Sequence, residues 1–199
     1  MTSIKTIFIF SIVILFSCNT QTEKREKWIR EHSHGIALSD TLNYNDLEFL
    51  DDLLKDKRIV FLGESGHGVA EYTLLKSRVI RYLHEKLDFN VLAFEVNSAD
   101  AFAANYYNSF TNADSTIYNS ISTLWHVEEI VPLFNYIIAS HNSKDPIFVQ
   151  GVDLTQSNAS CAFSEFLYNL IHPEDPEYAE EIKYKDSLFS ARGVAKFTN

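Results

Sequence analysis

The sequence predicts an α/β domain in which a parallel-stranded sheet is flanked by helices. Three short apolar runs, at residues 58–63, 90–95 and 147–152, each end at or beside a glycine or an acidic residue, as buried strands commonly do. Segments with helical spacing of apolar residues lie between the runs. Strands that alternate with helices pair in parallel through right-handed crossovers, so we expect the three strands to be adjacent in one sheet.

Four helices are expected in order along the chain. Residues 43–56 place leucines at helical spacing with acidic residues between them, and residues 70–87 carry one continuous apolar face. Residues 99–107 are rich in alanine and aromatic residues. Residues 127–141 form the fourth helix, provided that Pro132 lies in the first turn, where its missing N–H does no harm.

Composition limits the classes of function. The chain has 199 residues, of which 46% are hydrophobic, so it is long enough and apolar enough to bury a core. Its formal net charge is −10, and no cluster of basic residues offers a face for phosphates. We therefore expect no nucleic-acid partner. One α/β domain over residues 41–199 accounts for the folded part.

The first residues resemble an export signal. Lys5 precedes the apolar run at 7–16, which is short for a mature membrane span but suits the apolar core of a signal peptide. Cys18 follows small Ser17, as in a bacterial lipobox. We expect a signal peptide at 1–17, lipidation at Cys18, a tether at 18–40, and a lipoprotein held by that anchor at the membrane of the bacterial cell envelope. An ordinary cleaved signal or a membrane-anchoring helix is the alternative.

The segment "GESGHG", residues 63–68, carries the strongest functional signal. A serine nucleophile elbow requires G-x-S-x-G, but around Ser65 the second glycine is replaced by His67. A phosphate loop requires a lysine after its last glycine, and none follows Gly68. These departures disfavour both Ser65 as a nucleophile and a nucleotide phosphate site.

His67 close to a helix start, with carboxylates nearby, suits the activation of water. The helix dipole disfavours an imidazolium there, and Glu64 or Glu95 can hold the ring by a hydrogen bond. Glu95 ends the second predicted strand and Asp153 follows the third, so parallel pairing brings these acids to one edge of the sheet. The simpler alternative is that His67 caps the helix and Glu64 is a solvated loop residue.

Four sequence blocks in order resemble the erythromycin esterase family, which includes succinoglycan biosynthesis proteins. They are "GESGHG", "AEYTLLKSRVIRYLHEKLDFNVLAFE", "WHVEEI" and "QGVDL", within residues 58–156. The resemblance implies that the domain is the N-terminal portion of an erythromycin-esterase-like α/β fold. It also implies catalytic roles for His67, Glu64 and Glu95, and substrate-binding roles for Lys76, Trp125, Glu129 and Asp153.

This resemblance implies the hydrolysis of an ester or lactone, with His67 as the general base for water and Lys76 stabilising negative charge. The implied substrate is a small ester or lactone, or an acylated saccharide; macrolide hydrolysis, which confers antibiotic resistance, characterises only part of the family. Family members usually run to about twice this length and have a further active-site histidine in their second half. The domain is therefore expected to be C-terminally incomplete, and a lipoprotein that only binds a ligand or partner is the alternative function.

A metal-dependent hydrolase is a second alternative. No organic cofactor is expected, but Glu64, His67 and Glu95 form a nitrogen and oxygen set that suits a divalent cation, with Asp153 or His126 as further ligands. The helical H-E-x-x-H pattern of many zinc enzymes is missing from the sequence, so the metal hypothesis depends on whether the fold groups these side chains.

Overall fold

The computed structural model describes residues 21–39, 42–106, 111–153 and 162–195. The chain forms two compact units, divided between Ala37 and Leu38. In the first unit residues 21–32 are helical. The predicted signal peptide and Cys18 lie outside the described residues, and among the described helices none is long and apolar enough to cross a membrane.

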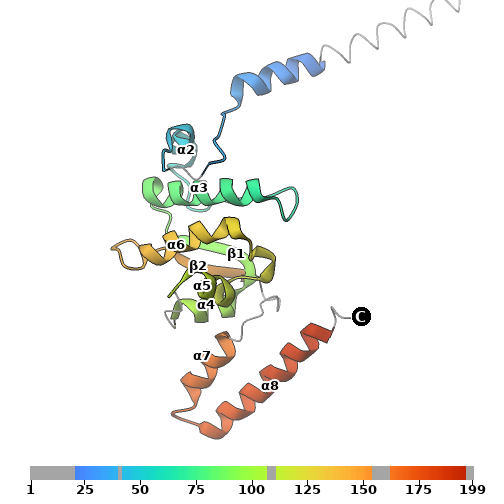
Figure 1. Ribbon diagram of the computed structural model, residues 1–199, viewed down its shortest axis with the longest axis vertical. Helices are drawn as coiled ribbons and strands as arrows, with labels where there is room; N and C mark the ends of the chain where they lie inside the picture. Colours follow the sequence, from blue (N-terminus) through green and yellow to red (C-terminus); the bar gives the residue numbers. More distant parts are fainter. Residues whose placement is uncertain (1–20, 40–41, 107–110, 154–161, 196–199) are drawn as a thin grey trace, which may run out of the picture. The chain divides into compact units, whose positions relative to one another are not determined.

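The second unit has the predicted α/β architecture, with two parallel strands and helices packed around them (Figure 1). Its elements in chain order are η1 (Asn45–Leu47), α2 (Phe49–Leu54), α3 (Ala70–Leu87), β1 (Val91–Asn97), α4 (Ser98–Tyr106), α5 (Ala113–Ser120), η2 (Thr123–Trp125), η3 (Glu128–Ile130), α6 (Val131–Ser140), β2 (Phe148–Asp153), α7 (Ala162–Ile171) and α8 (Pro176–Ala195).

The parallel pairing of β1 with β2 confirms the crossover argument for these two strands. Val91 lies beside Phe148 and Phe94 beside Gly151, with an irregularity that ends where Asn97 lies beside Asp153. Since side chains alternate between the two faces of a strand, one face of this sheet packs on the core and the other does not. The core face carries Leu92, Phe94, Val96 and Val149, which pack with Ile117, Ile121, Leu133, Phe134 and Ile137.

We name the opposite side of the sheet the open face. Its side chains are largely exposed: Val91 is 58% exposed, Phe148 42% and Val152 69%. The remaining side chains of the open face are Ala93, Glu95 and Gln150.

The prediction of a strand at 58–63 is wrong; these residues are within the described part of the chain and do not form a strand. This segment has neither helical nor strand structure, and Ile59 and Phe61 are 71% and 92% exposed. An apolar run becomes a buried strand only when a neighbouring strand satisfies its backbone groups and another layer covers its side chains. Within the described residues β1 pairs with β2 alone, so this segment has neither.

The helix predictions differ in accuracy. α3 spans the predicted residues 70–87 and ends at Asp88, which adopts a left-handed conformation with φ 58°. In α6, Pro132 lies in the first turn, as required. The helix predicted at 43–56 divides into η1 and the short α2. α5, α7 and α8 were not predicted. The apolar residues of α8 are spread around the helix, whereas those of α7 lie on one face, a signal that the sequence does contain.

Gly151 allows β1 and β2 to approach closely. A Cβ atom at this position would lie 2.5 Å from the Val96 carbonyl oxygen and 2.6 Å from that of Asn97. These are backbone atoms, so the strands would have to separate. We expect Gly151→Ala to lower the free energy of unfolding by about 1–3 kcal/mol in urea denaturation, which is typical of overpacking. Gly63→Ala is the control, because its Cβ would meet nothing within 4 Å; equal effects would contradict this explanation.

Candidate active site

The "GESGHG" loop connects the irregular segment 58–63 to the start of α3. Gly68 has φ 75°, a left-handed conformation that favours glycine and lets the chain turn into the helix after His67. α3 begins at Ala70, and Val69 precedes it without a side-chain cap. The turn therefore holds Glu64 and His67 beside the first turns of α3.

Glu64 links two side chains from different parts of the site. Its Oε1 atom accepts a hydrogen bond from His67 Nδ1 at 2.6 Å, and its Oε2 atom accepts one from Lys76 Nζ at 2.5 Å. The Glu64 side chain is only 13% exposed, whereas His67 is 61% exposed. Of the two carboxylates predicted to hold the imidazole ring, Glu64 is the one that does so.

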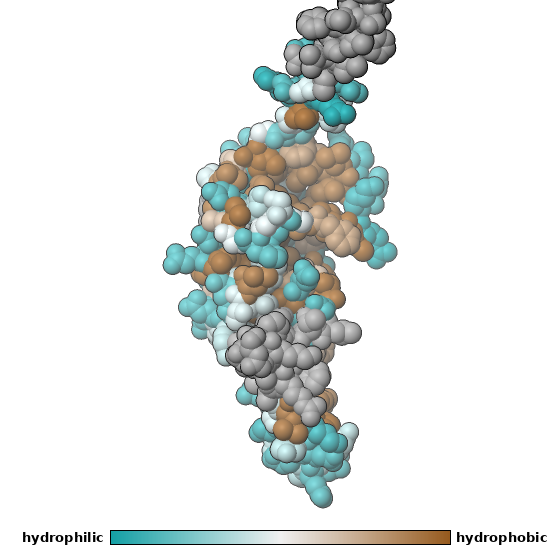
Figure 2. All heavy atoms as spheres, turned by 90° about the vertical axis from the view of Figure 1, so that its right-hand side faces the viewer, coloured by the Kyte–Doolittle hydropathy of each residue, from teal (hydrophilic) through white to brown (hydrophobic). Residues whose placement is uncertain are grey.

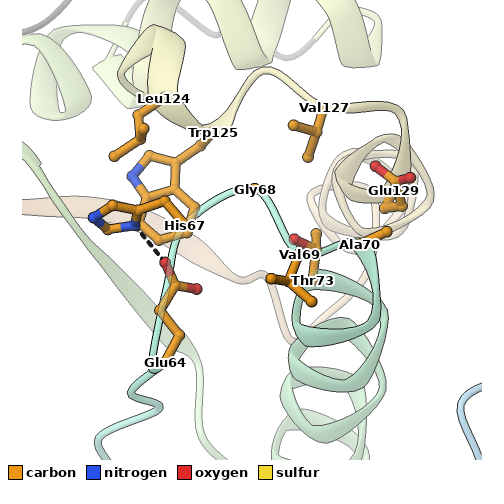
Figure 3. Close-up of a pocket in the computed structure, with 10 residues that line it drawn as sticks. All are labelled: Glu64, His67, Gly68, Val69, Ala70, Thr73, Leu124, Trp125, Val127 and Glu129. Atoms are coloured by element: carbon orange, nitrogen blue, oxygen red, sulfur yellow. Dashed lines mark hydrogen bonds and ion pairs between the residues drawn. The ribbon is translucent and has the colours of Figure 1, made fainter.

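The electrostatics of the site keep Glu64 ionised. The hydrogen bond from Lys76 is the largest influence, and together with the hydrogen bond from His67 it lowers the pKa of the Glu64 carboxyl, against an opposing effect of burial. An ionised carboxylate only accepts hydrogen bonds, so Nδ1 of His67 carries the proton. A neutral ring then has its lone pair on Nε2, which points away from Glu64 (Figure 3).

The lowered pKa of Glu64 predicts how the stability of the fold depends on pH. Ionised Glu64 stabilises the fold above its ordinary pKa of 4.5, and this contribution is lost as the pH falls through the lower folded-state value.

We expect Lys76→Met to raise the pKa of Glu64, measured by carbon NMR titration of the side-chain carboxyl, because the strongest hydrogen bond is removed. Lys76→Arg is the control, since it keeps the positive charge. No shift in Lys76→Met would contradict the assignment.

Trp125 forms an aromatic wall of the site. The Lys76 ammonium lies 5.4 Å from the centre of its ring, and the His67 ring meets it edge-on at 6.3 Å between centroids. On the core side, Trp125 also contacts Phe94 of β1 at 5.9 Å. Trp125 thus connects the loop and α3 to the sheet, which supports its predicted place in the site.

These residues surround a small pocket of about 90 Å³ (Figure 3). It lies between the loop with the start of α3 on one side and the η2–η3 segment on the other. The predicted residues Glu64, His67, Trp125 and Glu129 all line it. The other lining residues are Gly68, Val69, Ala70, Thr73, Leu124 and Val127.

Sequence reasoning missed several of these lining residues. Thr73 lies between Ala70 and Lys76 at three-residue spacing on α3, so helical periodicity counted from Lys76 would have placed it on the same face. Leu124 lies in the short 3₁₀ turn η2 and Val127 directly before η3, where no period in the sequence indicates which side chains point inward.

Ser65 lies in the same loop but has a different partner. Its hydroxyl lies 2.6 Å from the Tyr72 hydroxyl, and Ser65 is exposed. A serine nucleophile needs a base within hydrogen-bonding reach, and the partner of the Ser65 hydroxyl is the Tyr72 hydroxyl instead of an imidazole nitrogen. This arrangement agrees with the broken elbow motif.

The remaining predicted residues lie elsewhere. Glu95 does not line the pocket: it is exposed on the open face of the sheet, opposite Phe94, which contacts Trp125. Asp153 ends β2 and lies beside Asn97 instead of Glu95, since β1 continues for two residues after Glu95. Asp153 does not line the pocket. His126 Nε2 bonds to the carbonyl of Ile121. Over residues 21–39, 42–106, 111–153 and 162–195, no three His, Cys, Asp or Glu side chains are grouped to hold a metal ion.

No family model matches the chain, but comparison with known proteins gives relatives named hydrolase or erythromycin esterase. The chain is 36% identical over 179 residues to the Bacillus subtilis (strain 168) protein named "Putative hydrolase YbfO", a match covering 88% of this chain and 40% of that one. It is 26% identical over 137 residues to Escherichia coli erythromycin esterase type II, covering 68% of this chain and 33% of the relative.

Solved structures show the same fold. The crystal structure of a succinoglycan biosynthesis protein matches with a TM-score of 0.65 at 20% identity, over 83% of this chain and 42% of that one. An erythromycin esterase mutant in its open conformation matches with a TM-score of 0.51 at 22% identity, over 78% and 41%. The chain spans between 33% and 42% of the length of these proteins, and over that part it is a homologue of the erythromycin esterases.

Proposed function

We propose that the chain forms the base-bearing part of a hydrolase that cleaves ester or lactone bonds. The observation that carries the proposal is the pairing of His67 Nδ1 with Glu64 at 2.6 Å, which leaves Nε2 directed away from the carboxylate. In this role, Nε2 removes a proton from a water molecule as the water oxygen attacks the carbonyl carbon. The bond from that carbon to the alcohol oxygen then breaks, and the leaving alkoxide takes the proton back from Nε2. The similarity to proteins named hydrolase and erythromycin esterase supports this class of reaction.

Glu64 positions the base and stabilises its charged form. When Nε2 takes the proton from water, the ring becomes an imidazolium, and an ionised carboxylate bonded to Nδ1 lowers the free energy of that state. Lys76 bonds to the same carboxylate and lies against Trp125, so its ammonium group is fixed at the site. Lys76 does not line the pocket that receives the carbonyl group, so we assign it to keeping Glu64 ionised and in place, and not to the predicted contact with the substrate.

The size of the pocket indicates which part of the substrate enters it. Ligand sites for drug-sized molecules usually enclose about 300–1,000 Å³. The pocket of about 90 Å³ has room for the attacking water and the carbonyl group alone. We therefore place the reacting group in this pocket beside His67 and Trp125, with the rest of a small ester, lactone or acylated saccharide outside it.

The proposal is tested by hydrolysis of a chromogenic acetate ester with intact-protein mass spectrometry during turnover. Water attack assisted by His67 releases acetate without a covalent acyl-enzyme, so the protein mass stays unchanged while product forms. A mass increase of one acetyl group on Ser65 would overturn the proposal in favour of a serine nucleophile. If this chain and its complex with the polypeptide described below both lack activity, the ligand-binding alternative is favoured.

A further inference from the structure

The sheet of the second unit is incomplete on one face and along one edge. Parallel sheets occur almost only with both faces covered by other layers, and most sheets have four or more strands. Here two parallel strands pack on a core through one face only, and the open face carries Val91, Phe148 and Val152 largely exposed. Figure 2 shows hydrophobic side chains gathered among polar ones over one side of this unit.

The outer edge of β2 is closed by a side chain. The amide group of Asn105, on α4, donates to the carbonyl of Val149 and accepts from the Val149 N–H at 3.3 Å. An asparagine amide in this position satisfies the backbone groups that a further strand would use. β2 is therefore protected from additional strand pairing at its centre.

The outer edge of β1 has no such protection in the described part of the chain. The N–H of Phe148, on β2, donates to the carbonyl of Asn90. In a parallel pair every second residue of a strand bonds to the same neighbour, so the residues of β1 that bond to β2 are Leu92 and Phe94. The backbone groups of Val91, Ala93 and Glu95 then point to the other side, and no backbone bond from them is found among the described residues. This edge has the geometry that accepts an added strand.

We propose that the open face and the outer edge of β1 bind polypeptide equivalent to the part of the erythromycin esterase relatives that this chain does not span. The chain uses 88% of its own length to match only 40% of its Bacillus subtilis relative, and 83% to match 42% of a solved structure. The surface that remains uncovered is apolar and lies on the sheet that these proteins share. A complementary layer would also cover Glu95.

The test uses this 199-residue chain with a tag, co-expressed with the part of the Bacillus subtilis relative that it does not match. We expect the two to purify together in a one-to-one ratio. Val152→Glu places a charge on the open face and should reduce the amount of complex at least tenfold. Leu170→Glu is the matched control, because Leu170 is 57% exposed on α7, away from the sheet strands, and should leave the complex intact.

Hydrogen exchange on the unaltered complex provides a second measurement that needs no folded variant. Binding should slow exchange at the amides of Val91, Ala93 and Glu95, while the Val149 amide, already bonded to Asn105, changes little. Absence of a complex, or a complex that Val152→Glu leaves intact without protection of β1, would overturn the proposal. If this chain instead associates with itself through the open face, the occupant of that face is a second copy of the chain, and the proposal is overturned. These readouts measure binding, so their failure is distinguishable from loss of esterase activity.

Discussion

His67→Ala lowers the rate constant for ester hydrolysis by about 10²–10⁴, because a positioned general base contributes that much to proton transfer. The substitution removes Nε2 and also the hydrogen bond to Glu64. The His67 side chain is 61% exposed, so its removal leaves the core intact. The loss should appear mainly in kcat, measured with the chromogenic ester on the active form of the protein, together with a circular dichroism spectrum that matches the unaltered protein.

Ser65→Ala is the control for His67→Ala. Both positions lie in the same exposed loop, and Ser65 bonds to Tyr72 instead of to the base. We expect Ser65→Ala to change kcat by less than about threefold, a small fraction of the loss expected from removing a general base. If Ser65→Ala is inactive while His67→Ala stays active, Ser65 and not His67 carries the catalysis, and the assignment of His67 as the base is wrong.

Asp46→Ala should lower the free energy of unfolding by about 3 kcal/mol. The Arg78 side chain is 2% exposed, and its guanidinium donates to both carboxylate oxygens of Asp46, at 2.9 and 2.7 Å. Removing the carboxylate leaves a buried positive charge without this counter-ion, which costs about 3–5 kcal/mol in comparable cases. Because Asp46 itself is 24% exposed, we expect the lower end of this range, measured by urea denaturation.

Asp52→Ala provides the comparison for Asp46→Ala. Asp52 forms an ion pair with Lys55 at 3.2 Å, but its side chain is 93% exposed and that of Lys55 is 61% exposed. Water and salt screen such a pair, so its removal should change the free energy of unfolding by less than about 0.5 kcal/mol. Similar losses in the two variants would show that burial of Arg78 does not control the effect.

The sequence by itself determined the elements whose information is local. The apolar face of residues 70–87 predicts α3 with its observed bounds, because a long helix repeats the same signal over several turns. The glycines beside His67 predict a tight turn before that helix, and the three-residue separation from Glu64 lets the carboxylate reach the ring. The resemblance added Lys76 and Trp125, and the fold brings Trp125 against the His67 ring and Lys76 to Glu64 and Trp125.

Only the tertiary structure decided which face of each strand meets the pocket and which strands form. Glu95 ends an apolar run, as a rim residue would, yet β1 continues to Asn97 and places Glu95 on the open face. Residues 58–63 have the composition of a buried strand, but strand formation depends on a neighbouring backbone and a covering layer, both set by distant residues. Helical periodicity is a property of one segment, whereas strand pairing and pocket lining are properties of pairs of segments, so the first can be predicted from the sequence and the second required the fold.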